Sequence, residues 1–130
     1  MSKWLRNNQP FGCPDDLGPL QLAWLGDSVW ELHQRLRHCQ KPGRTMDLHL
    51  SVVSEVRAGA QVLALKRLEP HLNEFEKELV RRGRNKAGRG PRNADAADYG
   101  KATGFETMVG WLFLKDPSRL AQLLDQLDEA

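Results

Sequence analysis

Apolar residues recur every three or four positions along most of the chain, which is the spacing of an amphipathic helix. The first such segment opens at Gly18-Pro19 and runs to about Arg37. Proline suits a first turn because the N–H that it lacks would have no partner there. We expect the apolar stripe of this helix to face the core. The stripe consists of Leu22, Leu25, Val29, Leu32 and Leu36.

The same spacing predicts helices over the rest of the chain. No segment alternates apolar and polar residues as a half-buried strand would, and no internal repeat is present. The predicted fold class is therefore all-α, a single-domain helical bundle. The predicted helices are 45–56 with Thr45 as N-cap, a continuation past a bend at 57–59 that ends at Pro70, then 71–82, 98–114 and a last helix from Asp116-Pro117.

Length and composition agree with one globular domain. The chain has 130 residues, of which 40% are hydrophobic and 28% charged, so it can form a core without being disordered. Residues 1–16 are expected to form an irregular arm, interrupted by Pro10, Gly12 and Pro14, and residues 17–130 the domain. The N-terminus has no apolar signal segment, and Cys13 and Cys39 are too sparse for a disulfide scaffold. We therefore expect a reduced, cytoplasmic protein that does not enter a membrane.

Charge is concentrated in one segment. The chain has 19 Lys and Arg against 17 Asp and Glu, but residues 81–92 contain only basic charges. Glycines and a proline in this segment predict a loop after the helix 71–82. A loop of one sign of charge indicates a polyanion as partner.

Two carboxylates lie in unusual surroundings. Asp27 is placed on the first helix away from the leucine stripe, between Trp24 and Trp30. The simpler interpretation is a solvated aspartate, and the alternative is a contacted surface such as a cleft or a dimer interface. Glu106 lies on an apolar helix whose residues three and four positions away carry no basic group, so it needs a partner from elsewhere. An arginine of another helix and a metal ion are the two candidates for this partner.

Two carboxylates on two helices are the minimum for a hard divalent cation. Together with a basic loop they suggest metal-assisted cleavage of a phosphodiester, although the spacing alone is a weak signal. The motifs of zinc sites and of nucleotide-binding sites are absent. The histidines at 33, 38, 49 and 71 do not have the spacing of a zinc site, and no phosphate-binding glycine motif follows a strand.

Two segments resemble the catalytic domain of ribonuclease III. Residues 22–31 (LAWLGDSVWE) resemble its signature helix, and residues 105–114 (FETMVGWLFL) resemble its second acidic motif. Leu48-His49, Ala60-Gln61 and residues 81–85 (RRGRN) are similar to the compact bacterial branch called Mini-ribonuclease III, which lacks a separate domain for double-stranded RNA. The resemblance covers about residues 18 to 125.

The resemblance implies a fold, an activity and a site. The fold would be a helical bundle of the ribonuclease III catalytic type, assembled as a homodimer whose two sites face one groove for double-stranded RNA. The activity would be Mg²⁺-dependent cleavage that leaves 5′-phosphate and 3′-hydroxyl ends and matures precursor 23S ribosomal RNA. A ribosomal protein on the substrate is a further candidate partner. Asp27 and Glu106 match the family's acidic positions, as catalytic residues and as metal ligands.

The chain also departs from the larger family members. Leu20, Ala23 and Thr103 stand where those enzymes carry further carboxylates, which leaves the number of metal ions open. A catalytically silent RNA-binding module of the same fold is therefore an alternative, as is a helical protein that binds another protein through its Trp face. RNA contacts are expected from the basic segment, through Arg81, Arg82, Arg84, Lys86, Arg89 and Arg92.

Overall fold

The computed structural model describes residues 14–40, 42–56 and 58–128, and this part of the chain contains helices and no strand. The all-α prediction is therefore confirmed. Two short 3₁₀ turns accompany the α-helices. The elements are η2 (Pro14–Asp16), α2 (Pro19–Cys39), α3 (Thr45–Val56), α4 (Ala58–Leu68), η3 (Glu69–His71), α5 (Glu74–Lys86), α6 (Ala96–Lys115) and α7 (Pro117–Asp128).

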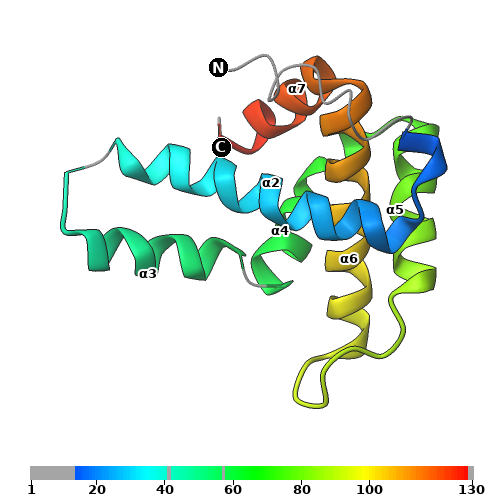
Figure 1. Ribbon diagram of the computed structural model, residues 1–130, viewed down its shortest axis with the longest axis horizontal. Coiled ribbons are helices and arrows are strands. Elements are labelled where there is room, and N and C mark those ends of the chain that lie inside the picture. The colour runs from blue at the N-terminus through cyan, green and yellow to red at the C-terminus, as the bar shows by residue number, and fades with distance from the viewer. Residues whose placement is uncertain (1–13, 41, 57, 129–130) are drawn as a thin grey trace.

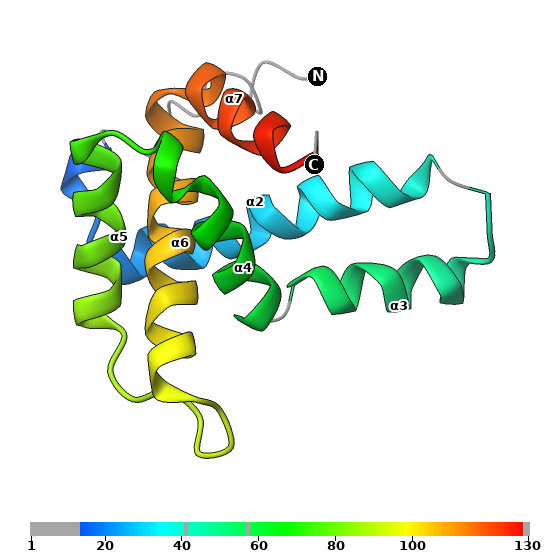
Figure 2. The same ribbon diagram turned by 180° about the vertical axis from the view of Figure 1, so that it is seen from behind.

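Helix α6 is the centre of the fold. α2 crosses it on one face, α5 runs beside it, α4 lies on the opposite face from α2, and α7 closes the top (Figures 1 and 2). Its residues Phe105, Met108 and Val109 are almost completely buried. A helix that is apolar on most of its circumference has to be surrounded in this way. Glu106 is therefore a carboxylate in the middle of the core helix.

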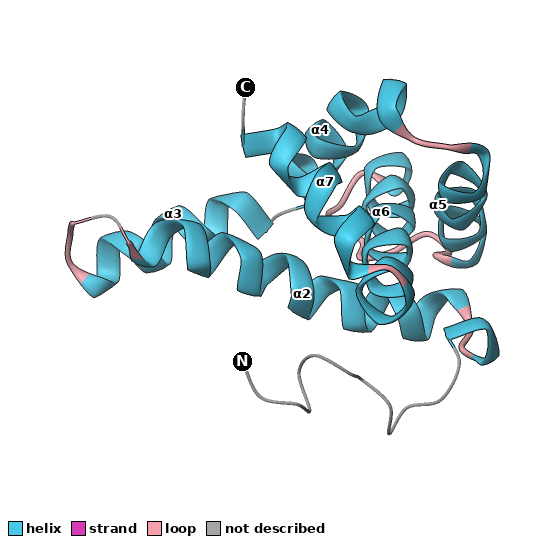
Figure 3. Cartoon of the chain, turned by 90° about the horizontal axis from the view of Figure 1, so that it is seen from above, coloured by secondary structure: helices cyan, strands magenta, loops and turns pink. Residues whose placement is uncertain are grey.

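The outer half of α2 extends away from this cluster with α3 alongside it (Figure 3). This pair leaves several large apolar side chains exposed, among them Leu32 at 51% and Leu36 at 53%. Both residues were predicted to face the core, and that prediction is wrong. Trp30 was predicted beside Asp27 on the opposite face, yet it is only 3% exposed and packs edge-on against Phe105.

The cause is the way in which α2 packs on α6. The buried face of α2 is centred on a glycine, because the two helices approach each other too closely for large side chains at the crossing. The predicted stripe therefore marks the inner face of α2 only in part: Leu22 is buried and Val29 packs against the core, whereas the stripe's outer leucines are exposed. The buried residues of α2 are Leu22, Ala23, Gly26, Trp30, Gln34 and His38.

Helix α5 starts and ends later than predicted. It begins after Asn73, whose side chain accepts a hydrogen bond from the Glu76 N–H at 2.8 Å, while Glu76 accepts one from the Asn73 N–H at 2.9 Å. This reciprocal pair is a capping box. The helix continues through Gly83 because that glycine packs on α6, where a Cβ would overlap Thr107. The first half of the predicted basic loop is therefore the last turns of α5.

A buried ion pair joins α5 to α7. Arg119 donates to both carboxylate oxygens of Glu76, at 2.7 and 2.9 Å, and to the carbonyl of His71 at 2.7 Å. Burial would raise the pKa of Glu76, but the hydrogen bonds from Arg119 and from the Asn73 backbone outweigh it and hold the pKa below its ordinary value. This carboxylate is satisfied within the fold, unlike Glu106.

Of the expected N-terminal arm, only residues 14–16 belong to the described chain, and they form η2. The Trp111 indole N–H donates to Asp15 at 3.1 Å and so ties this turn to α6. Residues 1–13, with Cys13, lie outside the described residues. None of the described helices is long and apolar enough to span a membrane.

Candidate active site

The crossing of α2 and α6 is a contact between two backbones. A Cβ at Gly26 would overlap the carbonyl oxygen of Glu106, and a Cβ at Gly110 would overlap the carbonyl oxygen of Leu22. Only glycine allows helices to approach this closely. The residue after Gly26 is Asp27, so the crossing brings its carboxylate to Glu106.

Asp27 and Glu106 form a carboxylate pair. Burial raises the pKa of Glu106 to about 8, and the hydrogen bond and the charge of Asp27 act in the same direction. Two carboxylates this close cannot both be ionised cheaply unless a positive charge joins them. Asp27 itself is exposed, so the pair is accessible from solvent. The crossing thus brings these two candidate site residues together.

Gln61 of α4 completes the cluster. Its side-chain amide donates to Glu106 Oε2 at 3.3 Å, and the residue is buried. This bond partly opposes the rise in the pKa of Glu106 because it favours the ionised form. Sequence reasoning assigned Gln61 no role beyond its place in a segment that resembles the family. The signal that could have singled it out is a glutamine at helical spacing with Ala64, Leu65 and Leu68, which form the apolar face of α4.

No basic side chain neutralises the pair within the described residues. The ion pairs found there involve other carboxylates, so an arginine from another helix, left open by the sequence, is not the partner of Glu106. Hard oxygen ligands with uncompensated negative charge fit a divalent cation. No group of three or more His, Cys, Asp or Glu suited to a metal occurs in the described chain. Water and substrate would have to supply the remaining ligands.

The three positions that lack the family's further carboxylates are accounted for. Leu20 is half exposed, Ala23 is buried, and the Thr103 hydroxyl donates to the Tyr99 carbonyl at 2.9 Å within α6. None of them adds an acidic oxygen to the pair.

The predicted RNA-binding residues are all exposed and follow one another from α5 into the loop before α6. Arg81 forms an ion pair with Glu78, its Nε lying 2.8 Å from Oε2, so part of its charge is compensated. The loop lies at the N-terminal end of α6 (Figure 1). Glu106 is ten residues from the start of that helix, or about 15 Å along its axis. The loop and the carboxylate pair are thus about 15 Å apart along α6. The α5 part of the basic segment lies nearer, since Gly83 packs on Thr107, next to Glu106. Both distances are within the reach of one duplex.

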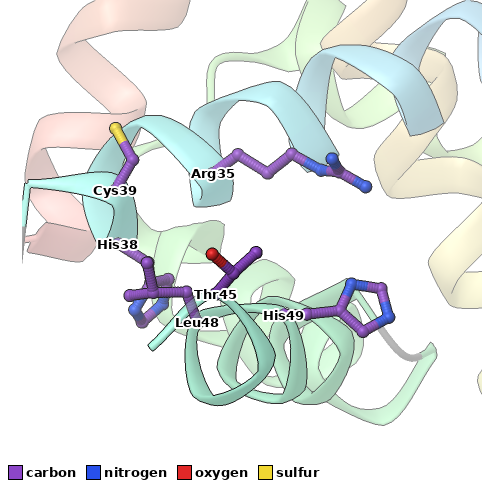
Figure 4. A pocket seen from close by; sticks show the side chains of 6 residues that line it. All are labelled: Arg35, His38, Cys39, Thr45, Leu48 and His49. Atoms are coloured by element: carbon purple, nitrogen blue, oxygen red, sulfur yellow. The ribbon is translucent and has the colours of Figure 1, made fainter. Parts of the chain in front are cut away.

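A pocket elsewhere is a weaker candidate. It lies between the outer half of α2 and α3 and is lined by Arg35, His38, Cys39, Thr45, Leu48 and His49 (Figure 4). The lining contains no carboxylate and none of the predicted site residues. We therefore place the candidate active site at the α2–α6 crossing.

Comparison with known proteins gives consistent matches. The model of the Ribonuclease III domain matches residues 20–117. A Synechococcus protein named Mini-ribonuclease 3 is 50% identical over 111 residues, which cover 85% of this chain and 80% of the relative. A protein of the same name from Gloeobacter violaceus is 48% identical over 108 residues, covering 83% and 80%.

A crystal structure of a Fusobacterium nucleatum protein has a similar fold. Its TM-score is 0.78 at 29% identity, with 88% of this chain and 93% of that chain covered.

Proposed function

The chain belongs to the ribonuclease III family, and from this we infer that it is an endoribonuclease acting on double-stranded RNA. We propose that Asp27 and Glu106 are its catalytic metal ligands and that the metal is Mg²⁺. The observation that carries the proposal is the carboxylate pair at the α2–α6 crossing, which has no basic partner in the described chain.

The donor set fits the chemistry of this ion. When bound, Mg²⁺ would activate a water molecule and neutralise the charge that develops on the phosphate. Asp27 and Glu106 supply two anionic oxygens, and Gln61 holds Glu106 in one orientation through its hydrogen bond. The backbone contact at Gly26 keeps the two carboxylates together. The pair is therefore preorganised for a cation.

Metal removal is expected to stop the reaction. We expect a long RNA duplex to be cut by the pure protein with Mg²⁺ and to remain intact with excess chelator, with activity restored when Mg²⁺ is added back. Gel analysis of end-labelled duplex measures this. Cleavage that continues at full rate in chelator would contradict the metal assignment, and no cleavage under any metal would favour the silent RNA-binding module.

We further propose that the basic segment binds the phosphates of the duplex. The residues are Arg81, Arg82, Arg84, Lys86, Arg89 and Arg92. A-form RNA offers phosphates and 2′-hydroxyls rather than readable base edges in its deep groove. Recognition would therefore rest mainly on shape and charge.

Neutralising part of this segment is expected to weaken RNA binding. In the variant Arg84→Ala, Lys86→Ala and Arg89→Ala, each lost phosphate contact should lower the slope of log Kd against log salt by about 0.7–0.9. Titration of duplex RNA at several salt concentrations measures the slope. A matched control is Lys66→Ala, since Lys66 is exposed on α4 outside the basic segment. An unchanged slope and KM in the triple variant would place the duplex elsewhere.

The biological substrate that we propose is precursor 23S ribosomal RNA, cut to leave 5′-phosphate and 3′-hydroxyl ends. This follows from the resemblance to Mini-ribonuclease III. A substrate of this kind places the protein in the cytoplasm and makes a ribosomal protein bound to the precursor a candidate partner.

A homodimer is supported by the apolar surface of the chain. Besides Leu20, six large apolar side chains among the described residues are exposed on α2, α3 and α4, and exposed apolar surface of this kind marks interaction sites. Trp24, at 82% exposure, lies three residues from Asp27. Two facing sites would also account for one cut in each strand. The six residues are Trp24, Leu32, Leu36, Met46, Leu50 and Leu63.

Sedimentation at micromolar concentration is expected to give about twice the chain mass of 14.8 kDa. A charge at Leu36, in the variant Leu36→Glu, should shift the mass towards the monomer because it would be desolvated in the interface. Ser118→Glu is the control, since Ser118 is exposed on α7. A monomer that still cuts both strands would contradict the dimer.

A further inference from the structure

The loop that connects α5 to α6 has a defined backbone. Gly88 and Gly90 adopt the left-handed conformation, with φ of +69° and +80°. Residues with a side chain rarely adopt this conformation, so glycine is required at both positions. Arg89 lies between them, and its position is therefore set by two constrained neighbours.

Gly90 also packs against an aromatic ring. A Cβ at Gly90 would lie 2.5–2.9 Å from three ring carbons of Tyr99, in the first turns of α6. Gly88 has the same handedness, yet a Cβ there would meet nothing within 4 Å. Close contact with Tyr99 is thus specific to one of the two glycines.

The two ends of the loop are fixed by hydrogen bonds. At the α5 end, the Ala87 N–H donates to the Arg84 carbonyl at 3.3 Å. At the α6 end, the Asp98 N–H donates to the Asp95 side chain at 3.0 Å, and the Tyr99 N–H donates to the Asp95 carbonyl at 2.9 Å. Tyr99 therefore belongs to a rigid first turn and can hold the middle of the loop from there.

The loop needs a contact that fixes its conformation, because its basic side chains repel one another. Lys86 at the end of α5 and Arg89 and Arg92 in the loop carry like charges over seven positions, with no acidic residue between them. Like charges favour an extended, fluctuating loop, and RNA binding would then have to order it at an entropic cost. A loop that is ordered beforehand avoids that cost.

We propose that Tyr99 is a positioning residue for the RNA substrate: its ring packs on Gly90 and fixes the basic loop in the conformation that meets the phosphates. This rests on the proposed RNA-binding role of the loop. Tyr99 acts through the loop backbone, and its hydroxyl has no part in the contact.

The first experiment tests the contact without RNA. Trypsin cuts after lysine and arginine, and exposed loops are cut in proportion to how often they open. Cleavage after Arg89 is expected to be about tenfold faster in Tyr99→Ala than in the wild type. Tyr99→Phe, which keeps the ring, should match the wild type. Equal cleavage in all three proteins would overturn the proposal.

The second experiment measures RNA. For Tyr99→Ala we expect KM for duplex RNA to rise about tenfold with kcat nearly unchanged. The salt slope should stay at the wild-type value because the same cations meet the same phosphates. The triple variant of the basic segment (Arg84→Ala, Lys86→Ala and Arg89→Ala), by contrast, should lower that slope. A loss in Tyr99→Phe as large as in Tyr99→Ala would assign the effect to the hydroxyl and overturn the proposal.

Gly90→Ala and Gly88→Ala form a matched pair that leaves Tyr99 and the core intact. Both carry the cost of a left-handed alanine, but only Gly90→Ala forces the ring away. We expect Gly90→Ala to reproduce the faster proteolysis and the higher KM, and Gly88→Ala to show the smaller change. Equal effects of the two variants would overturn the role of the ring. Faster proteolysis in Gly90→Ala together with unchanged RNA binding in the triple variant of the basic segment would confirm the contact between Tyr99 and the loop. It would refute the RNA-binding role of the basic segment.

Discussion

Duplex RNA is expected to be cut at least about a thousandfold more slowly when Asp27 is replaced by Asn or Glu106 by Gln. The amides keep the size and shape of the side chains but remove the negative charge that would hold Mg²⁺. Stabilisation of the developing phosphate charge by a metal supplies several kcal/mol of the barrier reduction. Single-turnover cleavage of a labelled duplex at saturating protein measures the loss without interference from binding.

The pH dependence of stability tests whether the pKa of Glu106 is raised in the folded protein. In the folded protein without metal, the pKa of Glu106 is about 8 against an ordinary 4.5. The folded state therefore keeps a proton that the unfolded state releases, and this stabilising contribution is lost as pH rises from about 4.5 to 8. Glu106→Gln has no such proton, so its melting temperature in chelator should fall less between pH 5 and 8 than that of the wild type.

Without metal, RNA affinity should hold or increase in Asp27→Asn, because a carboxylate facing a phosphate repels it. It should hold in Glu106→Gln, because a side chain with a pKa of about 8 is mostly protonated at neutral pH. Asp125→Asn is a matched control, since Asp125 is an exposed acid on α7, away from the carboxylate pair and the basic segment. Turnover close to the wild type in either site variant would remove that residue from the mechanism. A parallel loss of melting temperature and activity would assign it to the fold.

Much of this arrangement could be predicted from the sequence. Helical spacing, proline breaks and glycines predicted the all-α class and most helices to within a few residues. Asp27 and Glu106 stood out because neither fitted its surroundings: one lay between tryptophans, and the other lay on an apolar helix without a basic neighbour. Both positions were also supported by the resemblance to ribonuclease III.

What could not be predicted depended on contacts between helices. A helical wheel finds an apolar stripe, but it cannot say which side of the helix a partner will cover. In α2 the partner approaches at Gly26, so Trp30 is buried and Leu36 is exposed. The glycines of residues 81–92 predict a loop, yet Gly83 packs on α6 and lies inside α5. These close contacts between helices could not be predicted from the sequence patterns. The contact at Gly26 also assembles the candidate site.

The closest of these approaches makes a strong prediction for Gly26→Ala. Alanine normally stabilises an exposed helix position by about 1 kcal/mol relative to glycine. Here its Cβ would overlap the backbone of Glu106, which cannot rotate away. The helices must separate, and forced overpacking of this kind costs about 3 kcal/mol. Cleavage should fall steeply as well, because Asp27 moves with the helix while Glu106 does not.

Gly59→Ala is the matched control for this change. Gly59 lies in α4 with nothing within 4 Å of a Cβ, so the same substitution should leave the melting temperature unchanged or raise it slightly. Opposite signs in the two variants would show that contact, and not helix propensity, decides the outcome at Gly26. Thermal melting beside duplex cleavage measures both effects. If Gly26→Ala melted and cleaved like the wild type, the backbone contact would not be what holds the two carboxylates together, and another element would have to position them.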